Sequence, residues 1–102
     1  MNEIPTEERI RSELRQVIDP ELGVNIIDLG LVYELKFQDN ELRIVMTMTS
    51  PACPLNAYLS DSIRTILIRS FPGIKSVTVD FVWDPPWSPE RMTQDARRLL
   101  GR

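Results

Sequence analysis

Two stretches of alternating apolar and polar residues, joined by the dipeptide Asp39-Asn40, constrain the fold of this chain more than any other feature of its sequence. Residues 31–37 and residues 42–49 each place apolar side chains at every second position, a pattern typical of strands with one buried face. Asp39 and Asn40 both tolerate the positive φ angles that a two-residue hairpin turn requires. The sequence therefore predicts an antiparallel β-hairpin.

A helical pattern precedes this hairpin. Residues 6–18 carry apolar side chains on one face, and Thr6 is placed to cap the first turn. We expect Asp19-Pro20 to end this helix, because the residue before a proline avoids helical geometry. Residues 20–30 then form a connector with glycines at its bends.

A second helix and a third strand are predicted after the hairpin. The helix is expected to run from Pro54 to a stop at Phe71-Pro72-Gly73, with Cys53 as its N-cap. Apolar residues alternate again over residues 77–83, which predicts a strand that includes Trp83.

A last helix is predicted after the rigid turn Asp84-Pro85-Pro86. Ser88 would be its N-cap and Pro89 its first residue, while Trp87 and Met92 would pack together as a hydrophobic staple. The apolar face of this helix is expected to consist of Ala96, Leu99 and Leu100.

These elements predict a single α+β domain over residues 1–102. The order is α-β-β-α-β-α, with a three-stranded sheet and the helices packed on it. The connection between the second and third strands is expected to be a right-handed crossover.

Composition excludes several classes of function. The formal net charge of −3 disfavours nucleic acid as a partner, since phosphate binding needs a concentrated basic surface. The chain has no histidine, which excludes Ser-His-Asp and Cys-His catalytic pairs, and no Gly-rich phosphate loop, which argues against a nucleotide cofactor. We therefore expect a protein that is not an enzyme. No signal peptide or membrane span is evident, so we expect a cytoplasmic protein without a membrane partner.

Cys53 is the first candidate functional residue. A thiol at the N-terminus of a helix is held nearer its thiolate form, which is the form that binds metal or attacks an electrophile. Thr49 and Ser50 would add hydroxyl donors nearby. A small buried residue at a tight corner explains Cys53 equally well from the pattern alone.

Three carboxylates in the connector are the next candidates. Asp19, Glu21 and Asp28 could supply oxygen ligands or proton acceptors if the connector packs beside the Cys53 turn. Asp19 and Asp28 could equally brace turns, as aspartates do at the ends of helices and strands. Asp28 is the best candidate of the three, because its apolar neighbours predict partial burial.

The segment Trp83-Asp84-Pro85-Pro86-Trp87 is a candidate partner anchor. Aromatic side chains on stiff backbone lose little entropy on binding. A structural explanation competes with it, in which Trp83 ends a core strand and Trp87 staples the last helix.

Three blocks of the chain resemble the SufT/PaaD-like family of iron–sulfur cluster assembly proteins, in the same order and spacing. They are residues 19–33, residues 48–55 and residues 82–92. The resemblance implies an α+β assembly domain in its minimal stand-alone form and a role in maturing iron–sulfur proteins. It places the family's cysteine at Cys53 and its acidic positions at Asp19, Glu21 and Asp28.

The resemblance leaves two hypotheses of different class. In the first, the protein is an assembly or transfer factor in which Cys53 ligates a transient iron–sulfur cluster or iron. One thiol cannot fill the four positions of an ordinary cluster, so the site would be shared with assembly proteins, a client apoprotein, a second copy in a homodimer or a small thiol. In the second, the protein is an adaptor that docks the assembly machinery onto client apoproteins and never holds a cluster.

Overall fold

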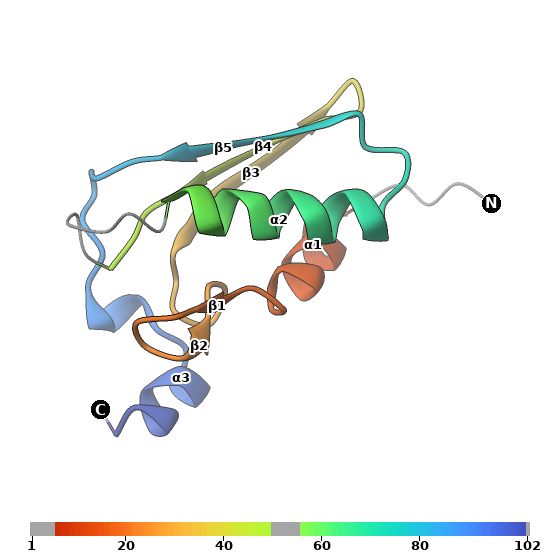
Figure 1. Ribbon diagram of the computed structural model, residues 1–102. Helices are drawn as coiled ribbons and strands as arrows, with labels where there is room; N and C mark the ends of the chain where they lie inside the picture. Colours follow the sequence, from red (N-terminus) through yellow and green to blue (C-terminus); the bar gives the residue numbers. More distant parts are fainter. Residues whose placement is uncertain (1–5, 50–55, 102) are drawn as a thin grey trace.

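The polypeptide folds as a three-stranded sheet with helices on one face, as a computed structural model shows (Figure 1). The structure describes residues 6–49 and 56–101. The predicted α+β class and the order of the main elements are confirmed.

The hairpin lies where its alternating pattern predicts. Strands β3 (Val32–Gln38) and β4 (Glu41–Met46) pair antiparallel, and both Asp39 and Asn40 have positive φ angles, 53° and 64°. β4 is the central strand, because β5 (Ser76–Phe81) pairs parallel to its other edge. A parallel neighbour requires a crossover, which α2 (Asn56–Ser70) provides; its right hand stays a prediction.

The core lies between this sheet and two helices. α2 crosses one face of the sheet, and α1 (Glu7–Leu14) packs beside it on the same side (Figure 1). The central strand and both helices contribute fully buried side chains: Ile10, Leu14, Leu42, Ile44, Met46, Leu59, Ile63 and Leu67. All of them belong to the apolar sets that the periodicity predicts.

The first helix is shorter than predicted. Thr6 caps it as expected, accepting a hydrogen bond from the Arg9 N–H at 3.2 Å, but the helix ends at Leu14 rather than at residue 18. The reason is competition from a second partner: Ile18 and Asp19 form β1 (Ile18–Asp19), which pairs with β2 (Val24–Asn25). The connector is thus a small two-stranded ribbon, which the sequence does not predict.

The end of the chain also differs from the prediction. β5 ends at Phe81, so Trp83 lies outside the sheet and is 46% exposed. The single last helix is divided into a 3₁₀ turn η1 (Pro89–Arg91) and α3 (Gln94–Leu99), because Met92 between them is extended. The Ser88 side chain caps neither. Thr93 is the N-cap of α3, and its side-chain oxygen accepts a hydrogen bond from the Ala96 N–H at 3.2 Å.

Met92 is buried in the core and Trp87 packs against that core, whereas Leu99 does not; the staple contact between Trp87 and Met92 stays a prediction. Ala96 is fully buried and Leu100 packs against the core, but Leu99, in the same short helix as Ala96, is 76% exposed.

Candidate functional site

The connector reaches the end of β4 through one side-chain contact. Glu21 lies in the turn between β1 and β2, and Thr49 follows β4. The Thr49 hydroxyl donates a hydrogen bond to Glu21 Oε1 at 3.1 Å. The connector therefore contacts Thr49, in the same sequence block as Cys53, while its packing beside the Cys53 turn itself stays a prediction. Cys53 and Ser50 themselves lie outside the described residues.

Asp19 is buried and braces the connector. The residue is 1% exposed, its carboxylate accepts a hydrogen bond from the Leu22 N–H at 3.1 Å, and its backbone pairs with Val24. Burial raises the pKa of the Asp19 carboxyl, the hydrogen bond from Leu22 opposes this, and the nearby charge of Glu21 adds to it. This geometry fits the turn-bracing explanation of Asp19.

Asp28 is held by two neighbours. Its Oδ2 accepts from Asn25 Nδ2 at 2.9 Å, and its N–H donates to Asn25 Oδ1 at 2.8 Å. Arg15 Nε lies 3.6 Å from Asp28 Oδ1, and the Asp28 side chain is 22% exposed, so the predicted partial burial is confirmed. These contacts satisfy the carboxylate locally.

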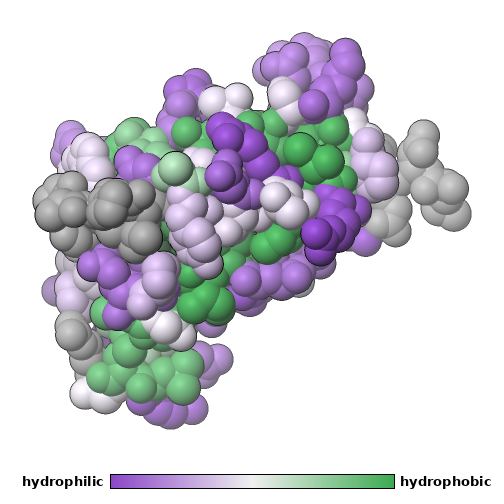
Figure 2. Space-filling model, in the orientation of Figure 1, coloured by the Kyte–Doolittle hydropathy of each residue, from purple (hydrophilic) through white to green (hydrophobic). Residues whose placement is uncertain are grey.

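Asp28 faces the C-terminal helix rather than the Glu21–Thr49 pair. With Asp95, Arg98 and Leu99 it lines a cavity of about 430 Å³. Apolar surface is visible over this end of the molecule (Figure 2), where Leu99 is highly exposed. Within residues 6–49 and 56–101, no hydrogen bond or ion pair joins Asp28 to Glu21 or Thr49. The structure therefore brings together Glu21 and Thr49, with Asp19 beneath them, and leaves Asp28 apart.

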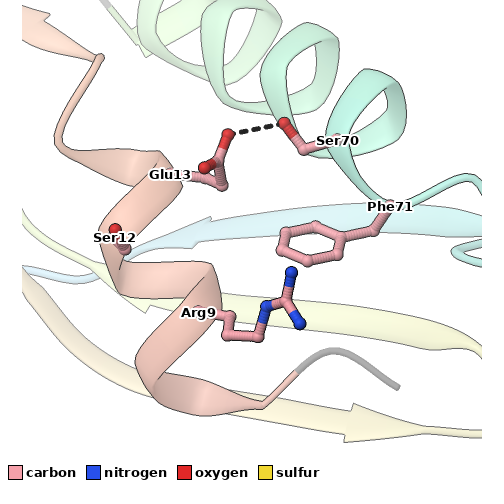
Figure 3. A pocket seen from close by; sticks show the side chains of 5 residues that line it. All are labelled: Arg9, Ser12, Glu13, Ser70 and Phe71. Carbon is pink, nitrogen blue, oxygen red and sulfur yellow. Dashed lines mark hydrogen bonds between the residues drawn. The ribbon is translucent and has the colours of Figure 1, made fainter. Parts of the chain in front are cut away.

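Two further cavities are lined by none of the thiol, hydroxyl and carboxylate residues that the sequence predicts for the site. The first, about 400 Å³, lies between α1 and the end of α2 and is lined by Arg9, Ser12, Glu13, Ser70 and Phe71. The Ser70 hydroxyl donates to Glu13 Oε1 at 2.7 Å, and the Arg9 guanidinium points toward the Phe71 ring (Figure 3).

The second cavity, about 450 Å³, is lined by Gly30, Val32, Tyr33, Pro85 and Arg91. Sequence reasoning placed Pro85 in the candidate anchor segment and none of the other four in a site, although all five stand inside blocks that resemble the family. Their pairing depends on contacts between segments more than 50 positions apart, which no local pattern reveals.

The described residues alone do not form a metal site. In the part of the chain that the structure describes, no three His, Cys, Asp or Glu side chains are grouped so that they could hold an ion. None of its helices is long and apolar enough to cross a bilayer.

Comparison with known proteins identifies the family. The family model for iron-sulfur cluster assembly proteins matches residues 7–81. The chain is 42% identical to the Fe-S protein maturation auxiliary factor YitW of Bacillus subtilis, over 92% of each chain. It is also 42% identical to the Fe-S protein maturation auxiliary factor SufT of Staphylococcus aureus, over 83% of this chain and 97% of that one.

A solved structure supports the same assignment. The fold matches the crystal structure of a domain of unknown function from Bacillus anthracis with a TM-score of 0.89 and 42% identity, over 93% of this chain and 91% of that one. The fold and the sequence thus agree with the resemblance carried by the three blocks. The chain belongs to the iron-sulfur cluster assembly family.

Proposed function

We propose that this protein is an auxiliary factor in the maturation of iron–sulfur proteins, and that it acts through the thiol of Cys53. The family match spans residues 7–81 and so includes this cysteine, and relatives that match nearly end to end are named as maturation factors. The observation that carries the site is the hydrogen bond between Thr49 and Glu21. It holds Thr49, which follows β4 and stands four positions before Cys53.

The chemistry follows from what a single thiol can do. Cys53, as a thiolate, supplies one soft ligand to iron, and an ordinary cluster needs four cysteine-type ligands. The remaining ligands come from an assembly protein, a client apoprotein, a second copy of this chain or a small thiol. Such an under-ligated cluster is cargo, and exchange with a client that offers four cysteines is downhill. The protein binds and hands over its cargo in the cytoplasm without catalysing a reaction of its own.

Glu21 has a supporting role in this proposal. Glu21 is exposed, its carboxylate accepts a hydrogen bond from the Thr49 hydroxyl, and among residues 6–49 and 56–101 it forms no ion pair with a cation. Glu21 therefore holds Thr49 in place with one carboxylate oxygen. Its second carboxylate oxygen stays available for iron, as a hard ligand suited to a labile site.

An adaptor function is the second candidate, and Trp83 favours it. This indole is 46% exposed and directly precedes the stiff Asp84-Pro85-Pro86 turn, so the structural explanation that places it at the end of a core strand is wrong. A large exposed aromatic on rigid backbone is typical of a protein-docking anchor. In this function the protein brings the assembly machinery to clients without holding a cluster.

Anaerobic reconstitution with iron and sulfide separates the two functions. We would compare the wild type, Cys53→Ser and Trp83→Ala by visible absorption, iron content and native mass, and then add an apoprotein client that needs a [4Fe–4S] cluster. The transfer function predicts a coloured species at less than one cluster per chain, lost in Cys53→Ser and kept in Trp83→Ala.

The adaptor function predicts the opposite pattern. Neither wild type nor variant would hold iron above background, and Trp83→Ala would weaken capture of the client while Cys53→Ser would not. If Cys53→Ser retained both iron and client activation, the proposed role of the thiol would be refuted.

A further inference from the structure

The cavity between the start of β3 and the 85–91 segment is built rather than incidental. It is an open hollow of about 450 Å³, within the size range of small-ligand sites, and its walls come from the connector, from β3 and from the segment after β5. Gly30, Val32 and Pro85 give it an apolar lining. Tyr33 and Arg91 supply its polar groups.

The Tyr33 side chain is fixed at both its edge and its face. The hydroxyl donates to the Pro85 carbonyl oxygen at 2.8 Å, and the Arg91 guanidinium lies over the ring, 4.6 Å from its centre. A cation over an aromatic face is attracted by the ring electrons, and this arrangement leaves the N–H edge of the guanidinium open. The cavity is therefore preorganised before any ligand arrives.

The wall that carries Arg91 is held against the connector by close backbone packing. A Cβ atom at Gly30 would lie 2.3 Å from the Arg91 carbonyl oxygen and 2.8 Å from Arg91 Cβ, so only glycine admits this approach. Trp87 Nε1 donates to the Leu29 carbonyl oxygen at 2.7 Å, and the Thr93 N–H donates to that of Asp28 at 2.8 Å. These contacts on both sides of η1 keep Arg91 in position.

The charge in this cavity is not neutralised. Arg91 is the one charged residue among those lining it, and it forms no ion pair with any residue in the described ranges 6–49 and 56–101. Asp84, the nearest acid to Pro85 in sequence, is exposed and does not pair with Arg91. Arginines elsewhere on the molecule do have carboxylate partners: Arg11 of α1 pairs with Glu7, and Arg43 of β4 pairs with Asp80.

We propose that this cavity binds a peptide carboxylate, together with the apolar side chain beside it. A guanidinium stacked on a ring presents two parallel N–H donors, which match the two oxygens of a carboxylate. The apolar surface of Val32, Tyr33 and Pro85 receives the neighbouring side chain. The proposal goes beyond the function given above, because it assigns a docking site for a partner polypeptide and uses neither Cys53 nor Glu21.

The carboxylate can come from a C-terminus or from an acidic side chain, and three peptides distinguish these sources. The probes are N-acetylated tetrapeptides: one ends in leucine with a free carboxylate, one is its C-terminal amide, and one is an amide with glutamate before the leucine. Each is titrated into the full-length, ¹⁵N-labelled protein. The readout is the amide, Arg91 Nε and Trp87 Nε1 resonances.

We expect saturable shifts confined to residues 30–33 and 85–91 with at least one carboxylate peptide, and at least about tenfold weaker binding of the plain amide. Arg91→Gln should abolish the shifts, and Arg91→Lys should weaken binding because it keeps the charge and loses the fork. Arg69→Gln is the matched control, because it removes the same charge from an exposed position near the end of α2.

The result that overturns the proposal is equally specific. Absence of shifts at millimolar peptide would do so, as would equal losses in Arg91→Gln and Arg69→Gln, which would indicate attraction by net charge alone. Unchanged thermal unfolding and an unchanged spectrum away from the cavity show that Arg91→Gln is folded. If that variant is not folded, Arg91→Lys and the comparison of acid with amide on the wild type decide the question.

Discussion

Gly30→Ala tests the packing on which the C-terminal segment depends. Gly30 has a φ angle of +76°, and an alanine there bears the cost of left-handed backbone, roughly 1–2 kcal/mol. Its Cβ would also lie 2.3 Å from the Arg91 carbonyl oxygen. Backbone cannot rotate away as a side chain can, so the 87–93 segment must move outward.

The free energy lost through that displacement follows from the contacts that hold the segment. The segment is held by the hydrogen bonds from Trp87 Nε1 to Leu29 and from the Thr93 N–H to Asp28. Each contributes about 0.5–1.5 kcal/mol, so losing both adds about 1–3 kcal/mol. With the backbone term, Gly30→Ala should lower the free energy of unfolding by about 2–5 kcal/mol.

Gly23→Ala is the matched control for this prediction. Gly23 has nearly the same φ angle, +71°, but no atom lies within 4 Å of a Cβ built there. It should therefore lose only the backbone term, roughly 1–2 kcal/mol. Urea unfolding of both variants measures the difference. Equal losses would show that the close approach of Arg91 to Gly30 does not stabilise the fold, and would remove one support from the proposed carboxylate site.

Three further predictions concern buried polar groups. Thr47 is fully buried and its hydroxyl has no partner within the described residues, so Thr47→Val should raise the free energy of unfolding by about 1 kcal/mol in a urea titration, whereas Thr47→Ser should lower it. Burial raises the folded-state pKa of Asp19 above its ordinary 3.8, so the folded state binds the carboxyl proton more tightly than the unfolded state does. The contribution of Asp19 to stability therefore falls as pH rises from 3.8 through the raised folded-state pKa. Asp19→Asn should therefore gain stability relative to the wild type between acidic and neutral pH, and a pH-independent difference would contradict the assignment. Asp28→Ala should cost about 1–2 kcal/mol in thermal unfolding, because it loses the hydrogen bond from Asn25 Nδ2 and the ion pair with Arg15 but keeps the backbone N–H bond to Asn25 Oδ1, and a loss no larger than that of the exposed control Asp61→Ala would refute this role.

Local patterns predicted the elements whose stability is local. The hairpin turn at Asp39-Asn40 and the cap at Thr6 depend on residues adjacent in sequence, and both are confirmed. The burial of Ile44 and Ile63 follows from periodicity, because a strand or helix with one apolar face has only one way to turn it toward the core.

Patterns failed where a distant segment competes for the same residues. Ile18 fits the apolar face of the first helix, but pairing with Asn25 offers its backbone another partner. Ser88-Pro89 is a good helix start by composition, yet a 3₁₀ turn forms there because Arg91 must reach Gly30 and Thr93 must reach Asp28. Neither outcome can be calculated from the residues alone.

The same reasoning applies to the candidate site. Asp19, Glu21 and Asp28 lie close in sequence, and this spacing suggested a common role. The structure separates them: Asp19 is buried beneath the turn, Glu21 contacts Thr49, and Asp28 faces α3. A short connector that folds into a two-stranded ribbon points its side chains in different directions, which spacing does not reveal.

The connector emerges as the element that joins all three of the blocks by which the family is recognised. Through Glu21 it holds Thr49, in the block that contains Cys53. Through the backbone of residues 28–30 it holds Trp87, Arg91 and Thr93, in and beyond the tryptophan block. One small ribbon thus fixes the approach to the proposed cluster-handling thiol and one wall of the proposed carboxylate cavity. Because the two sets of contacts use different residues, a change at Gly30 should disturb peptide binding and leave the Glu21–Thr49 contact intact, so the two functions are separable by mutation even though one element supports both.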